Sequence, residues 1–303
     1  MRLDDLDPSD NVRDLGSGGG GGGFGGGGFN LLGLLPLLLG RRMGCGTIAL
    51  LLIVGAGYLM LSGGGGGLIP AQNVGQGARQ PQVAQGGAGG AVCNTAERLF
   101  ACRVLESTEQ TWEPIFAAQG SRYQAPTLNF YQGGAQSGCG AASSAAGPFY
   151  CPPDQGIYLD TSFFDELASR FGARGDFAQA YVIAHEVGHH IQNLTGQAAE
   201  VSRAQARLGR AEGNAMSVRL ELQADCYAGV WAARNRSRLE QGDIEEGLTA
   251  ANAIGDDTLQ RQSQGTVVPD SFTHGSSAQR VKWLRIGLQS GDPAACDTFS
   301  GAI

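Results

Sequence analysis

The chain has 303 residues, of which 50 are glycine, and it carries a formal net charge of −7. Glycine at more than twice its usual frequency of about 7% leaves part of the chain without the side chains that build a core. Collagen-like structure is excluded because no Gly-x-y period persists, and wholesale disorder is excluded because 42% of the residues are apolar. The segment from Cys93 to the C-terminus is long enough for one well-buried domain.

The negative charge belongs to this C-terminal segment, because the aspartates and arginines of residues 1–92 cancel. Protein surfaces that bind the phosphate backbone of a nucleic acid are usually basic. We therefore expect no nucleic-acid partner.

The N-terminal third of the sequence predicts a membrane-anchored protein. Residues 1–43 contain a Gly-rich, low-complexity stretch and are expected to form a disordered cytoplasmic tail. Residues 44–62 are mostly apolar and have the length that crosses a hydrocarbon core. Arg41 and Arg42 precede this span directly, which places the N-terminus in the cytoplasm and the C-terminal domain outside.

A cleaved signal peptide is the alternative, but a lead of some 40 residues is longer than an ordinary n-region. We therefore expect an uncleaved, single-pass signal anchor at 44–62 in contact with the lipid bilayer. Residues 63–92 are then a flexible linker, and the domain at 93–303 lies in the periplasm or the extracellular space.

Cysteine usage agrees with this orientation. Cys45 lies in the predicted span, and the other six cysteines fall on the outer side, where an even number suggests disulfides. Six cysteines allow fifteen pairings. Proximity in the sequence favours Cys93 with Cys102 and Cys139 with Cys151, which leaves Cys226 with Cys296. The absence of C-x-x-C spacing disfavours a thiolate zinc site or a redox motif.

In chain order, Thr95 to Ala118 is expected to be helical, with a break near Pro114. Two β-like segments follow, Thr127 to Tyr131 and Gly156 to Phe164. Asp176 to Leu194 is expected to be a second helix, because its apolar residues recur every three or four positions and Gly196 follows its end.

The pentapeptide HEVGH, residues 185–189, lies inside this second helix. Residues four apart project from one helix face, so His185 and His189 offer two imidazoles to one metal ion while Glu186 reaches a water on that metal. This is the H-E-x-x-H pattern of zinc hydrolases. Three of the four histidines of the chain cluster here, and His190 points away because it lies about 100° further around the helix.

A catalytic zinc needs a third protein ligand. Glu221 is the candidate, on a helix expected from Ala215 to Ala233, and Asp225 one turn later is placed to accept a hydrogen bond from a ligating imidazole. The alternative is a pair of solvated carboxylates. It is disfavoured because apolar neighbours indicate a largely buried helix, where a carboxylate needs a partner.

Long strings of the sequence resemble the bacterial putative neutral zinc metallopeptidase family, a group of zincins. They are YVIAHEVGHHIQNL, LELQADCYAGVWA, GDIEEGL, AIGDD and PDSFTHGSSAQRVKWL, and SDNVRD near the start resembles the N-terminal signature of that family. The resemblance implies an α+β, zincin-like metallopeptidase domain at 93–303, with the HExxH helix and a small β-sheet. It also implies one Zn²⁺ per domain, a peptide or protein substrate and a place at the bacterial cell membrane. The E-x-x-x-D arrangement is similar to that of gluzincin-type membrane proteases, which favours Glu221 over Asp225 as the ligand.

His274 precedes a helix expected from Ser277 to Leu288. Its similarity to a T-H segment of related zincins implies that His274 hydrogen-bonds the oxyanion and that Arg280 orients a nearby carboxylate. A partly exposed loop histidine is the alternative, and Tyr181 and Tyr227 are alternative oxyanion donors.

The predicted function is hydrolysis of peptide bonds by a metal-activated water, with zinc on His185, His189 and Glu221 and with Glu186 as the base. The segment from Gly156 to Phe164 is expected to be an edge strand along which the substrate aligns. One alternative is a non-catalytic, zinc-stabilised envelope binding module, which has no need of Glu186. Another is a structural protein with an accidental motif, which predicts no zinc.

Overall fold

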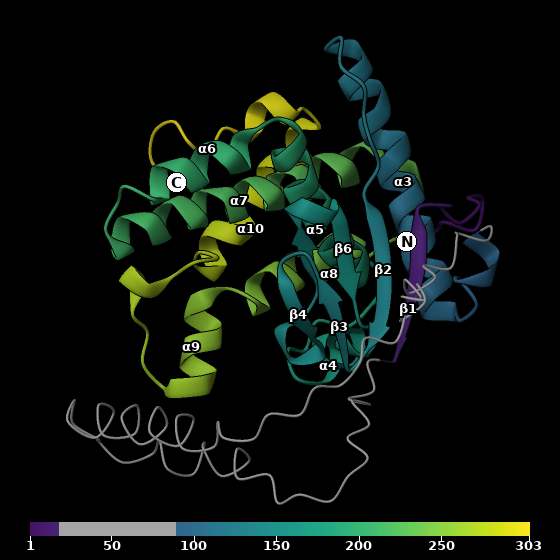
Figure 1. The fold of residues 1–303 in the computed structure, drawn as a ribbon, viewed down its shortest axis with the longest axis horizontal. Helices are drawn as coiled ribbons and strands as arrows, with labels where there is room; N and C mark the ends of the chain where they lie inside the picture. The colour runs from purple at the N-terminus through teal and green to yellow at the C-terminus, as the bar shows by residue number, and fades with distance from the viewer. Residues whose placement is uncertain (18–88) are drawn as a thin grey trace, which may run out of the picture. The chain divides into compact units, whose positions relative to one another are not determined.

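The computed structural model describes residues 1–17 and 89–303 (Figure 1). Its main sheet has four strands in the order β1 (Val12–Ser17), β2 (Thr127–Gln132), β6 (Gly156–Leu159) and β5 (Phe149–Cys151). β1, β2 and β6 are parallel, and β5 runs antiparallel to β6. A hairpin of β3 (Gly134–Ser137) and β4 (Gly140–Ser143) forms a second, two-stranded sheet.

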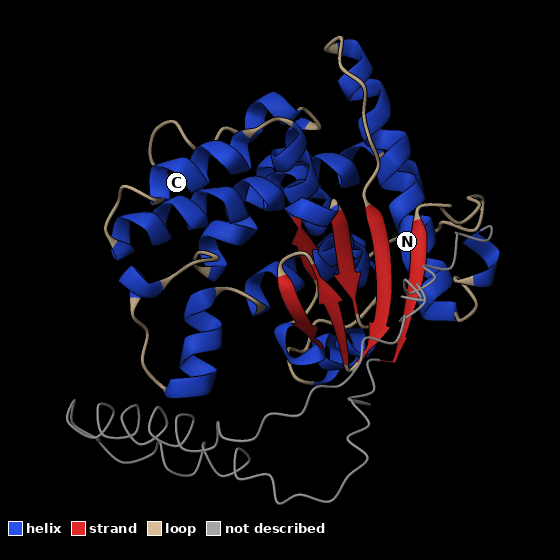
Figure 2. Ribbon diagram, viewed as in Figure 1, coloured by secondary structure: helices blue, strands red, loops and turns tan. Residues whose placement is uncertain are grey.

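Eight α-helices accompany the sheets in the described part of the chain, and α6, α7 and α10 lie together to the left of the strands in Figure 2. The helices are α3 (Ala96–Ala118), α4 (Ser162–Ser169), α5 (Asp176–Leu194), α6 (Gln197–Gln205), α7 (Arg210–Arg234), α8 (Asp243–Ala253), α9 (Asp256–Gln264) and α10 (Ser277–Ser290). The domain is therefore α+β.

The bounds of α5 are those expected from periodicity. α3 differs from expectation because it continues through Pro114 to its end, with Trp112, Ile115 and Phe116 buried against the core on both sides of the proline. Packing thus outweighs the single backbone hydrogen bond that the proline removes.

The prediction of a strand from Gly156 to Phe164 at the edge of the sheet was wrong. β6 ends at Leu159, where Asp160 accepts a hydrogen bond from the backbone N–H of Ser162 (3.0 Å) and the chain turns into α4. β6 also pairs on both sides, with β2 and with β5. The edge strands of this sheet are β1 and β5.

The first 17 residues are part of this domain, which corrects the expectation of a separate disordered tail. Val12 pairs with Leu128, so β1 extends the sheet, and Met1 and Leu3 are buried in the main core. The Met1 ammonium lies 2.8 Å from a carboxylate oxygen of Asp176, the first residue of α5.

The transmembrane part of the predicted fold class was also wrong. Among the helices of residues 1–17 and 89–303, none combines the length and the apolarity that a membrane span requires. β1 and β2 share a sheet and must lie on the same side of any bilayer, whereas the predicted single-pass orientation separates them. Three predicted segments lie wholly or partly outside the described residues: residues 18–43 of the tail, the span at 44–62 with its proposed bilayer contact, and residues 63–88 of the linker predicted at 63–92. The compartment of the domain stays a prediction.

Three disulfides cross-link the domain, and their pairing confirms the expected one. They join Cys93 to Cys102, Cys139 to Cys151 and Cys226 to Cys296. The third connects α7 to the C-terminal segment across 70 residues.

Candidate metal centre

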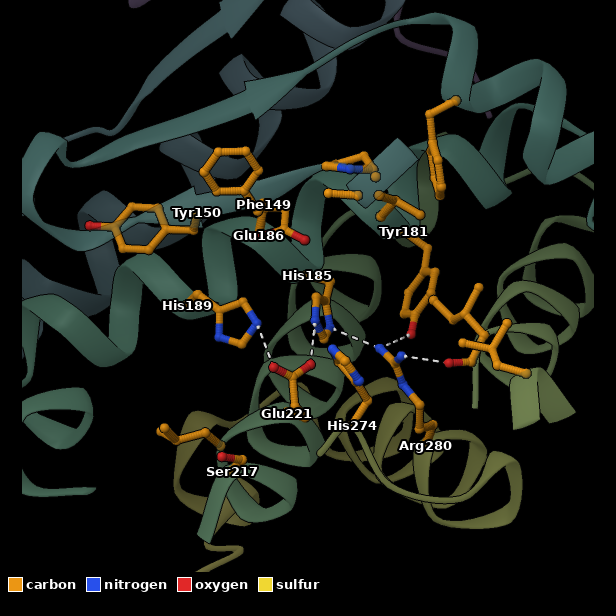
Figure 3. Close-up of a pocket in the computed structure, with 18 of the residues that line it drawn as sticks. Phe149, Tyr150, Tyr181, His185, Glu186, His189, Ser217, Glu221, His274 and Arg280 are labelled. Carbon is orange, nitrogen blue, oxygen red and sulfur yellow. Dashed lines mark hydrogen bonds and ion pairs between the residues drawn. The ribbon is translucent and has the colours of Figure 1, made fainter. Parts of the chain in front are cut away.

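Two imidazoles and one carboxylate converge between α5 and α7. The Nε2 atom of His185 lies 3.2 Å from Oε2 of Glu221, and the Nε2 atom of His189 lies 3.4 Å from Oε1 of the same carboxylate. One ligand atom from each residue falls within 4.8 Å of the others. Figure 3 shows the three side chains pointing toward one another.

A glycine inside the HEVGH motif allows this approach. A Cβ atom on Gly188 would lie 2.9 Å from the Cα of Ala224, closer than side chains tolerate. Gly188 therefore lets α5 pack directly on α7, which places Glu221 opposite the two histidines.

Asp225 is the partner of the first imidazole. Nδ1 of His185 donates to Oδ1 of Asp225 (2.9 Å), which leaves Nε2 for a metal. The Arg280 guanidinium donates to both oxygens of the same carboxylate at 2.9 Å, and the Tyr181 hydroxyl donates to it at 2.6 Å. Burial alone would raise the pKa of Asp225, but the charges of Arg280 and His185 hold it below its usual value.

The second imidazole has an amide partner that sequence reasoning missed. Nδ1 of His189 donates to Oε1 of Gln192 (2.9 Å), and the Gln192 amide donates to the carbonyl of Leu220 (2.7 Å). Leu220 directly precedes Glu221, so one buried glutamine connects a ligand on α5 with the backbone beside the ligand on α7. In the sequence, the only indication of this contact was that Gln192 follows His189 by three residues.

Glu186 lines a cavity of about 580 Å³ together with His185, His189 and Glu221. Burial raises the pKa of Glu186, although the two imidazoles oppose the shift. Burial would also raise the pKa of Glu221, but the imidazoles hold it well below its usual value. Glu221 is thus kept as an anion, while the raised pKa of Glu186 suits proton transfer.

His274 lines the same cavity and is oriented by Asp256, a second residue that sequence reasoning missed. Oδ2 of Asp256 accepts hydrogen bonds from the backbone N–H groups of Thr273 (2.7 Å), His274 (2.6 Å) and Gly275 (3.0 Å). Oδ1 lies 3.2 Å from Nδ1 of His274. The hydrogen bond to Asp256 raises the pKa of His274, whose side chain is 52% exposed, and leaves Nε2 unengaged by Asp256. In the sequence, the only indication of a role for Asp256 was that it belongs to the AIGDD string.

The structure does not support Tyr181 or Tyr227 as the oxyanion donor. The Tyr181 hydroxyl is committed to Asp225, and Tyr227 packs edge-on against Trp112 with ring centroids 5.4 Å apart. His190 faces away from the metal ligands, as expected. Its Nε2 donates to the carbonyl of Gln124 (2.6 Å), so its Nδ1 accepts from the Tyr150 hydroxyl (3.0 Å).

Comparison with known proteins agrees with this geometry. The sequence model of the family described as putative neutral zinc metallopeptidase matches residues 1–299. The chain belongs to this family. It is similar to the uncharacterized protein YpfJ of Escherichia coli K12, with 54% identity over 206 residues, 67% of this chain and 72% of the relative.

A second family relative is the uncharacterized protein Rv2575 of Mycobacterium tuberculosis H37Rv, with 45% identity over 223 residues, 68% of this chain and 73% of the relative. No solved structure matches the chain.

The donor set fits the zinc that the family name implies. Two imidazole nitrogens and a carboxylate are ligands typical of a catalytic zinc site that keeps a position for water. Both imidazoles have their Nδ1 atoms engaged by Asp225 and Gln192, which fixes the tautomer that presents Nε2. Among the described residues, a second group of side chains that could hold a metal ion consists of Asp176, Asp243 and Glu246. It lies beside the Met1 ammonium, which donates to Asp176 and Asp243.

Proposed function

We propose that the protein is a zinc-dependent endopeptidase whose metal is held by His185, His189 and Glu221. The observation that carries the proposal is the convergence of these three ligands beside the buried carboxylate of Glu186 in one cavity. Bound there, zinc would lower the pKa of a water molecule and polarise the scissile carbonyl. A binding module that only holds metal has no use for a base at this position.

Two side chains, Glu186 and His274, carry out the remaining steps of the proposed reaction. Glu186 takes a proton from the attacking water and delivers it to the leaving amine, a role that its raised pKa supports. His274 donates from Nε2 to the oxygen on which negative charge develops, and Asp256 positions it. His274→Ala is expected to lower kcat without loss of zinc. An unchanged kcat would contradict the role of His274.

We further propose that the peptide aligns along β5, the edge strand at the cavity, because Phe149 and Tyr150 of that strand line the cavity. A complex with a peptide analogue in which β5 makes no main-chain hydrogen bonds would contradict this placement. We also propose that the domain works in an oxidising compartment outside the cytoplasm, which its three disulfides support. Free thiols on the protein in alkylated cells would contradict this location.

The experiment that tests the function compares the whole chain with Glu186→Gln and Glu221→Ala. Zinc content is measured by elemental analysis, and casein cleavage is assayed on the same samples. We expect one zinc in the wild type and in Glu186→Gln, loss of zinc in Glu221→Ala, and cleavage by the wild type alone. Cleavage by Glu186→Gln would overturn the mechanism, and a folded wild type that binds no zinc would overturn the proposal.

A further inference from the structure

One wall of the cavity is built by the outward face of α4. Phe164 and Leu167 of this helix are buried in the core, so Phe163 and Glu166 share the other face, which Arg170 continues directly after the helix end; all three line the cavity. Their spacing of three and four residues places an aromatic ring at one end of this face and two charges toward the other.

Phe171 and Val182 continue the apolar surface toward the proposed base. Val182 precedes Glu186 by four residues on α5, so the two side chains lie on the same face about 6 Å apart along the helix axis. One residue of an extended peptide spans roughly 3.3 Å. A side chain received next to Val182 therefore belongs to a residue within about two positions of the scissile bond, a range that includes the two residues flanking it.

A segment of mostly small residues lines the cavity beside Phe163. Residues 145–148, with the sequence AAGP, line the cavity. Gly147 lies against Phe163, since a Cβ atom there would be 3.4 Å from the ring, and its φ of +76° suits glycine. Gly147 thus packs against the Phe163 ring, and the small side chains of Ala145 and Ala146 take up little of the cavity that they line.

The charges around the cavity do not favour a charged ligand group at this place. Arg280 is engaged by Asp225, and Glu221 by the two histidines. Glu166 and Arg170 are exposed, and they carry opposite signs one helical turn apart. A charged side chain would thus lose its hydration among apolar residues without a buried counter-charge from these groups, which is costly.

We propose that Phe163, Phe171 and Val182, beneath the 145–148 segment, form a subsite that receives a large apolar side chain beside the scissile bond. The inference rests on the proposed peptidase function and names its substrate class: peptides with Phe, Leu or a similar residue at the cleavage point. Burial of that side chain favours such peptides, as in other ligand sites where apolar walls surround a few polar groups.

The test uses three otherwise identical alanine-rich peptides with Phe, Ala or Asp at the centre. Their binding to zinc-loaded Glu186→Gln is measured by calorimetry, and their cleavage by the wild type is mapped by mass spectrometry. We expect the Phe peptide to bind at least about 10-fold more tightly than the Asp peptide and to be cut beside Phe. Val182→Phe fills the subsite, so this variant should prefer the Ala peptide over the Phe peptide, the reverse of the wild type. Val268→Phe, at an exposed position, should not.

The outcomes separate the two proposals. Cleavage without preference among the three peptides, or a preference for Asp, would overturn the subsite and leave the peptidase function standing. Preferential binding of the Phe peptide without cleavage by the wild type would support the subsite and overturn the peptidase function. Phe163→Ala, at a half-buried position, is the second variant if Val182→Phe does not fold, and it should weaken binding of the Phe peptide with zinc content unchanged.

Discussion

Asp225→Asn perturbs the most connected group of the metal centre. The carboxylate is fully buried and accepts hydrogen bonds from three side chains, Arg280, Tyr181 and His185. An asparagine has one oxygen, so its amide nitrogen must face at least one of these donors. The substitution also leaves the Arg280 guanidinium buried without its counter-charge.

Breaking a buried ion pair by removing one partner costs about 3–5 kcal/mol. We therefore expect the free energy of unfolding of the chelator-treated variant to fall by that amount. Zinc affinity should fall roughly 10-fold to 100-fold, because His185 loses the carboxylate that orients its ring. Urea unfolding measures the first quantity, and competition with a chromophoric chelator measures the second.

Two further variants test this prediction. Asp7→Asn makes the same chemical change at an exposed position and should alter neither quantity. Arg280→Gln in the Asp225→Asn background should cost less than the sum of the single changes, because the unpaired charge is removed. A loss of less than about 1 kcal/mol with unchanged zinc affinity would refute the reasoning that Asp225 links domain stability to ligand orientation.

Three further predictions concern the amide partner, the third histidine of the helix and the disulfides. Gln192→Ala should weaken zinc binding by about 10-fold or more, whereas Gln241→Ala, on an exposed side chain, should not; equal affinities would remove Gln192 from the metal centre. Burial lowers the pKa of His190 to about 4, so its contribution to stability is complete above its unfolded pKa near 6.5 and is lost as the pH falls toward 4. His190→Asn should reduce that acid-induced loss by about 3 kcal/mol, measured by urea unfolding across this range, and a variant with the wild-type pH dependence would count against a neutral His190. Replacing Cys226 and Cys296 by serine should cost about 4 kcal/mol against about 3 for Cys93 and Cys102, because the longer loop gains more chain entropy on unfolding; the reverse order in thermal unfolding would contradict this account.

The sequence alone determined the helix that carries the chemistry. Its bounds, Asp176–Leu194, follow from local periodicity, and the i,i+4 spacing within it brings His185 and His189 to one face whatever surrounds the helix. Disulfide pairing was also accessible, because two of the three bridges join cysteines within 12 residues of each other.

Tertiary structure decided what depends on segments far apart in the chain. β1 pairs with β2 across more than a hundred residues, and this pairing, which local patterns do not reveal, joins the N-terminal residues to the domain. β6 is a central strand because it pairs with both β2 and β5. Gln192 and Asp256 acquire their roles only when α5 meets α7 and α9 meets the segment before α10. Spacing along a helix fixes which side chains share a face, but only packing between helices fixes which groups those side chains meet.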